Sequence, residues 1–138
     1  MRVVAAALGL LLCLAVPARA QDDPLHLFLH FTEAAPANFD AAVRVGLQLQ
    51  SKGFDVVDLR PVGVTMQMTT IRYFYRELRG EAERLKGDLE RILAAQGVAD
   101  ARVRVQDFTF FRPKPRPNSL EIWIGTQNPA SRAALDRR

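Results

Sequence analysis

Two histidines on one short segment invite a metal or acid–base interpretation. His26 and His30 lie four positions apart within residues 25–31, where apolar residues alternate as in a β-strand. Four strand residues span about 13 Å, whereas zinc–nitrogen bonds are about 2 Å long, so the two rings cannot hold one ion. We therefore expect no metal site and assign both histidines a structural or solvated place beside a sheet.

The carboxylates offer no obvious catalytic pair. Asp55 and Asp58 belong to one expected strand, and their spacing of three predicts that they point to opposite faces of it. Asp107 precedes Phe-Thr and is typical of a residue that forms a turn. The sequence shows no Ser-His-Asp or Cys-His set and no glycine-rich phosphate loop, so it predicts neither catalytic residues nor a cofactor. A small enzyme with an unrecognised site on an open sheet face remains the alternative.

The most distinctive spacing is a cationic arm near the end of the chain. Residues 111–118 alternate basic residues with prolines, which excludes helix and sheet ladder alike and predicts an extended, polyproline-like segment. Such an arm either binds an anionic polymer or an acidic partner, acts as a proline-rich ligand, or only connects two strands. The candidate partner-binding residues are three cations of the arm and two on the strand before the second helix: Arg112, Lys114, Arg116, Arg72 and Arg76.

Five strands and two helices are expected to position these residues. Alternation predicts strands over 25–31, 54–62, 69–75, 101–108 and 120–124. A period of three to four predicts helices over 38–52 and 81–96, the second with an apolar face of Ala82, Leu85, Leu89, Ile92 and Leu93. Asn38 is the expected N-cap of the first helix, and Gly53 and Gly97 suit the left-handed position behind each helix. Gly46 indicates either a close approach to a sheet or a tolerated weak point.

This order predicts the α+β class: a two-layer α/β sandwich, ferredoxin-like β-α-β-β-α-β with an additional C-terminal strand. Right-handed crossovers place both helices on one face of the sheet. The other face is expected to be partly open and lined by His26, Phe28, His30 and Phe74.

Two further features leave alternatives open. Tyr73, Tyr75 and Trp123 form either a binding face or part of the core. The second or the fifth strand, if it lies at a sheet edge, can pair with a copy of itself, which makes a strand-pairing assembly module another alternative.

Residues 1–20 are predicted to be a cleaved signal peptide. Arg2 precedes an apolar run over 3–16, and Ala-Arg-Ala at 18–20 matches a signal peptidase site. The run of about 14 residues is shorter than the roughly 20 that a spanning helix needs. We expect one α/β domain over 21–125 and a flexible polar tail over 126–138. The only cysteine, Cys13, lies in the leader, and an exported chain without disulfides is typical of the bacterial periplasm.

The charge balance argues against a nucleic-acid partner. The leader holds two of the 19 basic residues and none of the 15 acidic ones, so the chain after cleavage has 17 against 15, a net charge of +2. Nucleic-acid binding needs a clustered excess of positive charge. We therefore expect a periplasmic or secreted protein without a membrane anchor after cleavage, whose partner is an envelope protein or an anionic glycan.

Several short motifs carry a family resemblance. A helix ending in Ser-Lys-Gly-Phe-Asp-Val-Val-Asp (51–58) is followed by a loop, by Thr-Thr-Ile-Arg-Tyr (69–73) and by an alanine- and leucine-bearing helix. This run, from 38 to 75, resembles the C-terminal domain of LytR-CpsA-Psr envelope proteins. The closing blocks at 105–109, 112–117 and 120–124 are similar to the endings of uncharacterised exported bacterial domains.

The sequence departs from that family at three points. The turn over 32–37 lacks the usual Asn-Gly pattern, and the large catalytic domain is absent from this sequence. Leu78 stands where relatives carry an aspartate that caps the second helix, so Glu77 or a backbone turn must serve instead. The resemblance thus implies a LytR C-terminal-like accessory or binding domain of the envelope, and it carries over no catalytic residue.

Overall fold

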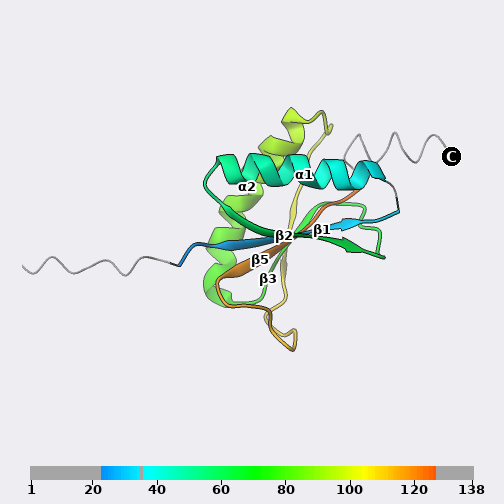
Figure 1. Ribbon diagram of the computed structural model, residues 1–138. Helices are drawn as coiled ribbons and strands as arrows, with labels where there is room; N and C mark the ends of the chain where they lie inside the picture. The colour runs from blue at the N-terminus through cyan, green and yellow to red at the C-terminus, as the bar shows by residue number, and fades with distance from the viewer. Residues whose placement is uncertain (1–22, 35, 127–138) are drawn as a thin grey trace, which may run out of the picture.

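The computed structural model describes residues 23–34 and 36–126 (Figure 1). The predicted signal peptide, 1–20, and the predicted tail apart from Thr126 lie outside these residues. Within the described part of the chain, no helix combines the length and the apolar character needed to cross a bilayer.

Five strands and two long helices make up the described fold. In chain order they are β1 (His26–Thr32), α1 (Pro36–Ser51), β2 (Asp55–Val62), β3 (Thr70–Tyr73), the short 3-10 helix η1 (Arg76–Leu78), α2 (Arg79–Ala95), β4 (Arg104–Asp107) and β5 (Ser119–Trp123). Each expected strand and helix is present, with ends that differ from the predicted ones by one to a few residues.

The strands form one mixed sheet in the order β2-β1-β5-β3-β4. β1 is parallel to both β2 and β5, β3 is parallel to β4, and β3 is antiparallel to β5. The strands of the β1-α1-β2 unit are therefore antiparallel to those of the β3-α2-β4 unit. In each unit the chain moves from an inner strand to an edge strand, at opposite sides of the sheet. Since a half-turn about the sheet normal relates such units, crossovers of one hand put α1 and α2 on the same face. The predicted two-layer α/β sandwich is confirmed. The prediction of a ferredoxin-like arrangement is wrong, because the two strands of each β-α-β unit pair directly with one another and β5 lies between the units instead of between the strands of one unit.

The core lies between the helices and one face of the sheet. Apolar residues repeat every two positions on the strands and every three to four on the helices, so each element presents one apolar side to this layer. Burying a side chain of this size contributes about 1.5–3 kcal/mol. Fully buried members include Leu27, Leu29, Ile71, Leu120 and Ile122 from the strands, and Val45, Leu49, Ala82, Leu85 and Leu89 from the helices. The predicted apolar face of the second helix is confirmed.

The helix ends agree only in part with the expected caps. Gly53 and Gly97 have φ of 90° and 86°, so both occupy the predicted left-handed position. The prediction of Asn38 as an N-cap is wrong, because α1 already begins at Pro36, a residue suited to a first turn. Instead, the buried Asn38 side chain donates from Nδ2 to the Thr32 carbonyl oxygen at 2.9 Å and ties the helix to the end of β1.

A backbone turn opens the second helix. η1 runs directly into α2, and the Leu78 amide donates to the Tyr75 carbonyl at 3.0 Å, with no hydrogen bond from a capping side chain. Of the two devices expected in place of a capping aspartate, the structure therefore uses the turn.

A bulge in β2 changes which side chains share a face. The register between β1 and β2 shifts after Leu27, so Val57 has no partner on β1 and Asp58 lies opposite Phe28. Asp55 lies opposite His26, on the same face as Phe28. The prediction that Asp55 and Asp58 point to opposite faces is wrong. Because of the bulge, their partners His26 and Phe28 are two residues apart on β1, so both aspartates lie on one face.

The strand order also fixes the edges of the sheet. β2 is an edge strand, in agreement with Pro61 within it, whereas β5 is paired on both sides. The prediction of the fifth strand as a pairing edge is therefore wrong, and β4 is the second edge.

Two glycines contact the sheet differently. A methyl group at Gly46 would lie 3.6 Å from Leu29 and 3.7 Å from Val56, which are ordinary contact distances. At Gly125 it would lie 2.5 Å from backbone atoms of Met68 and Thr69, so only glycine fits there.

Candidate functional site: the basic loop and the open sheet face

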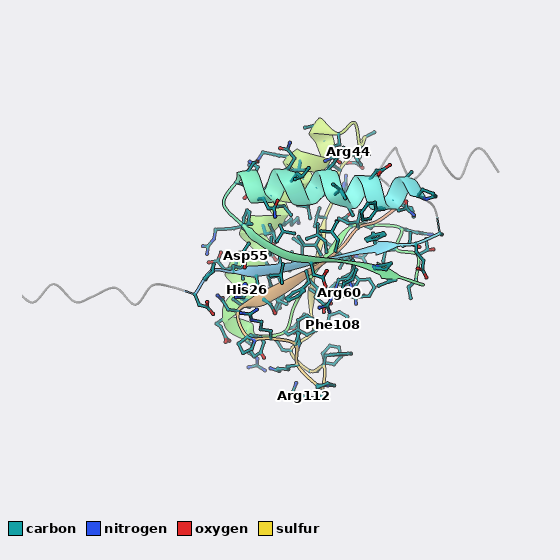
Figure 2. All side chains as sticks on the ribbon, viewed as in Figure 1. His26, Arg44, Asp55, Arg60, Phe108 and Arg112 are labelled. Atoms are coloured by element: carbon teal, nitrogen blue, oxygen red, sulfur yellow. The ribbon has the colours of Figure 1, made fainter. Side chains whose placement is uncertain are left out.

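The predicted cationic arm lies in the connection between β4 and β5, residues 108–118, which we name the basic loop. Figure 1 shows this connection descending from the sheet on the side away from α1. In Figure 2, Arg112 lies near the far end of the loop, below Phe108. The loop carries Arg112, Lys114 and Arg116 and contains no acidic residue.

Hydrogen bonds hold the loop in one shape. The Asp107 carboxylate accepts from the Thr109 amide at 2.8 Å, which confirms the predicted turn, and bonds from Thr109 lower the pKa of Asp107. The Phe111 amide donates to the Phe108 carbonyl at 2.9 Å, and the Tyr75 hydroxyl donates to the Pro115 carbonyl at 2.8 Å. The loop is therefore anchored at its start and near its end.

An aromatic cluster forms the base of the loop. Phe108 lies 5.9 Å from Phe74 and 6.1 Å from Phe111, measured between ring centres. Phe110 stacks on Phe108 at 5.6 Å. Phe74 is buried, but Phe110 and Phe111 remain 73% and 46% exposed. One edge of the cluster thus packs against the sheet and the other faces water.

The loop cations have different local contacts. Arg112 donates from Nη1 to the carbonyl oxygens of Thr109 and Phe111, at 2.9 and 2.7 Å. Lys114 places its ammonium group 4.8 Å from the centre of the Tyr75 ring. Arg116 is exposed. None of these contacts is to an acidic side chain; Arg112 and Arg116 are exposed and Lys114 is partly exposed.

The two candidate cations outside the loop lie near its base, where Arg76 acts electrostatically on Asp107 and Arg72 contacts Phe108. Arg76 is exposed at the start of η1. The guanidinium of Arg72 lies between two aromatic rings, 4.0 Å from the centre of Trp123 and 4.5 Å from that of Phe108. Burial lowers the pKa of Arg72. Arg72 therefore joins the aromatic base of the loop to the sheet.

On the open sheet face, the side chains around Trp123 pack against one another. His30 stacks on Trp123 with ring centres 4.5 Å apart and planes 9° from parallel. The indole nitrogen of Trp123 donates to Glu121 at 3.0 Å, and Glu121 lies 3.8 Å from Nε2 of His30. Burial lowers the pKa of His30, Arg60 and Arg72 act in the same direction, and Glu121 opposes them. Trp123 thus contacts His30 through its ring face and Glu121 through its indole nitrogen.

Two polar contacts lie near the edge of the open face. Arg60 donates to Asp58 at 2.8 Å while its guanidinium lies 4.9 Å from the centre of the Phe28 ring. His26 and Asp55 form a second pair, with Nδ1 and Oδ2 2.6 Å apart (Figure 2). His26, Phe28, His30 and the Phe74 ring that contacts Phe108 thus occur on this face, as expected.

Tyr73, Tyr75 and Trp123 do not form one surface. Tyr73 is buried in the helix-side core, Tyr75 contacts the basic loop and Trp123 lies on the open face. Of the two alternatives for these aromatics, a shared binding face is excluded by these positions.

A serine, a histidine and an aspartate fall in one row across the sheet, an arrangement that the sequence analysis did not anticipate. Register places His26 opposite both Asp55 and Ser119. Ser119 is completely buried and its hydroxyl donates to the Arg116 carbonyl, while Nε2 of His26 has no hydrogen-bond partner. A serine without solvent access and without a bond to the histidine is not a nucleophile that substrate can reach.

Metal-ligand groups and surface hollows were the remaining places at which chemistry could be expected. Among residues 23–34 and 36–126, no group of three or more His, Cys, Asp or Glu side chains can hold a metal ion. A hollow of about 370 Å³ between α2 and β4 has charges of both signs in its lining, which comprises Met68, Glu83, Lys86, Glu90, Arg102, Val103, Arg104 and Val105.

Comparison of the chain with protein-family models, with curated proteins and with solved structures finds no match. The LytR C-terminal-like family therefore stays a prediction from the motifs. The basic loop is the surface on which the functional argument rests.

Proposed function

We propose that this chain is a non-catalytic exported domain of the bacterial cell envelope that binds an anionic partner through the basic loop. One observation carries the proposal: Arg112, Lys114 and Arg116 lie on a single loop that contains no acidic residue. Cations without a neighbouring counter-charge attract an anionic partner and steer its approach.

The fixed shape of the loop supports a binding role. The bonds from Thr109 to Asp107 and from Tyr75 to Pro115 already order the loop before any partner arrives. Binding then costs less conformational entropy than it would for a flexible segment. A connection that only joined two strands would need neither these bonds nor exposed aromatic rings.

The cellular setting rests on the sequence. The predicted leader over 1–20 and the resemblance to LytR C-terminal-like domains both favour an envelope location. Within that setting an anionic glycan or an acidic protein surface presents the complementary charge.

The test measures binding of the purified protein to a soluble anionic polysaccharide and to its uncharged counterpart. The triple variant Arg112→Gln, Lys114→Gln, Arg116→Gln is expected to bind the anionic polymer about tenfold more weakly, because each exposed ion pair contributes about 0.2–1 kcal/mol. Binding of the unsubstituted protein should also weaken as salt is added.

The matched control removes the same charge elsewhere. Arg79, Arg84 and Arg91 are exposed on α2, and their triple replacement by glutamine should change affinity less than about twofold. An equal loss of affinity in both triple variants would show that binding depends on the net charge of the protein and not on the loop. No binding of the unsubstituted protein to any anionic partner would refute the proposal.

A further inference from the structure

Two phenyl rings beside the cations are not accounted for by charge. Phe110 and Phe111 are adjacent, and 73% and 46% of their surface is exposed. Phe110 stacks on Phe108, and Phe111 lies 6.0 Å from the buried Phe74 ring, so each ring is supported from behind. The loop therefore presents two supported, exposed rings directly before Arg112 in the chain, and adjacent exposed rings indicate an interaction surface more clearly than scattered apolar residues do.

The kind of partner follows from what each candidate offers to these rings and cations. A soluble anionic polymer neutralises Arg112, Lys114 and Arg116 and leaves much of the two rings in water. An anionic bilayer offers negative phosphates at its surface and an apolar layer directly beneath them. Phe, Trp and Leu side chains form the apolar face of segments that lie in that boundary. The combination of rings and cations on one loop therefore favours a bilayer surface.

The position of the loop suits such contact. It lies on the side of the sheet away from α1 (Figure 1), and it carries no acidic residue that anionic lipids would repel. The acid at its base, Asp107, already accepts the Thr109 amide. Arg112 uses Nη1 for two carbonyls of the loop, which leaves its other donors for phosphate.

We infer that the basic loop docks on the surface of an anionic lipid bilayer, with Phe110 and Phe111 in the boundary between headgroups and acyl chains and Arg112, Lys114 and Arg116 at the level of the phosphates. The inference rests on the proposed function and names the class of its partner. Contact of this kind is reversible and peripheral, because it buries two rings and spans nothing.

Sedimentation with lipid vesicles tests the inference on the purified protein. Vesicles of phosphatidylcholine with about one third phosphatidylglycerol are compared with vesicles of phosphatidylcholine alone, and the anionic polysaccharide is tested in parallel. The protein should bind the anionic vesicles and not the neutral ones. The triple glutamine variant of the loop should lose about a hundredfold in partitioning, and the double variant Phe110→Ala, Phe111→Ala about tenfold.

The control for apolar exposure lies on α1. Leu47 is 58% exposed, and Leu47→Ala should bind vesicles within about twofold of the unsubstituted protein. Circular dichroism shows whether each variant is folded. If the double phenylalanine variant fails to fold, Phe110→Ser replaces it, because Phe110 is the more exposed of the two rings.

The outcomes separate the inference from the proposed function. Binding of the anionic polysaccharide without vesicle binding overturns the inference and leaves the proposed function intact. Vesicle binding that is unchanged in the phenylalanine variants also overturns it, since charge alone would then account for the contact. Failure to bind either anionic probe overturns both.

Discussion

Replacing Gly46 with alanine should stabilise the protein. Gly46 lies in the middle of α1 on the side that faces the sheet, where a glycine lowers helix stability. The methyl group of an alanine would lie 3.6 Å from Leu29, 3.7 Å from Val56 and 3.9 Å from Leu59. These are contact distances without overlap, so the space accepts the added group.

The expected size has two parts. Alanine is favoured over glycine in a helix interior by about 0.8–1.0 kcal/mol. Burying one further methyl group contributes up to about 0.8 kcal/mol, part of which is lost to small adjustments of the neighbours. We therefore expect Gly46→Ala to raise the free energy of unfolding by about 1–1.5 kcal/mol.

Gly87 separates these two parts. It lies inside α2, and no heavy atom would lie within 4 Å of an added methyl group. Gly87→Ala should therefore gain the helix term alone, about 0.8 kcal/mol. The difference between the two variants measures the contact of the new methyl group with the sheet.

Urea unfolding followed by the fluorescence of Trp123, the only tryptophan, measures both variants. With a slope of about 1.5 kcal/mol per M, the midpoint should rise by about 0.7–1 M for Gly46→Ala and by about 0.5 M for Gly87→Ala. A lower midpoint for Gly46→Ala, or a gain smaller than that of Gly87→Ala, would show that α1 lies closer to the sheet than described here.

Three other substitutions test the helix core, a close backbone contact and a buried histidine. Leu89→Ala removes a completely buried side chain from α2 and should cost about 2–5 kcal/mol of unfolding free energy in the same urea assay; a change near zero would place this helix face wrongly. Gly125→Ala would force a methyl group within 2.5 Å of backbone atoms of Met68 and Thr69 and should cost about 1–3 kcal/mol or more, measured by thermal unfolding. The folded-state pKa of His30 lies below its ordinary value, so the unfolded chain binds more protons at acidic pH. The contribution of the neutral His30 to the free energy of unfolding is therefore fully present above about pH 6.5 and is lost as the pH falls below that value. A His30→Gln variant should show a weaker loss between pH 7.5 and 5.5, and an unchanged loss would contradict this reasoning.

The fold followed from patterns that act locally. The apolar repeat of α2, which includes Leu85 and Leu89, and the glycines behind each helix are set by neighbours in sequence, and each was predicted correctly. The placement of both helices on one face also followed, because crossover handedness is a general rule.

The errors arose where one residue or one distant pairing decided the outcome. Val57 adds a bulge that nothing in the alternation of β2 reveals, and it moved Asp58 to the other face. The central place of β5 depends on pairing with β1 and β3, far away in sequence. Asn38 lost its expected cap role because the helix began at Pro36.

The sequence analysis identified the cations of the candidate site but did not identify its aromatic residues. The alternation of cations and prolines identified the arm, whereas Phe108 was assigned to a strand and Phe110 received no role. The sequence signal for these rings was the run Phe-Thr-Phe-Phe directly before Arg-Pro. Because β4 ends at Asp107, this run lies in the loop. What sequence could not supply was the buried Phe74 that supports these rings from the sheet.

The position of β5 has a consequence for how the polypeptide acquires its structure. Among the described strands, only β5 joins the β1–β2 half to the β3–β4 half. Closure of the sheet therefore requires contacts between residues separated by most of the chain, and such topologies fold slowly. A chain that stops short of Ser119 therefore lacks the strand that joins the two halves of the sheet.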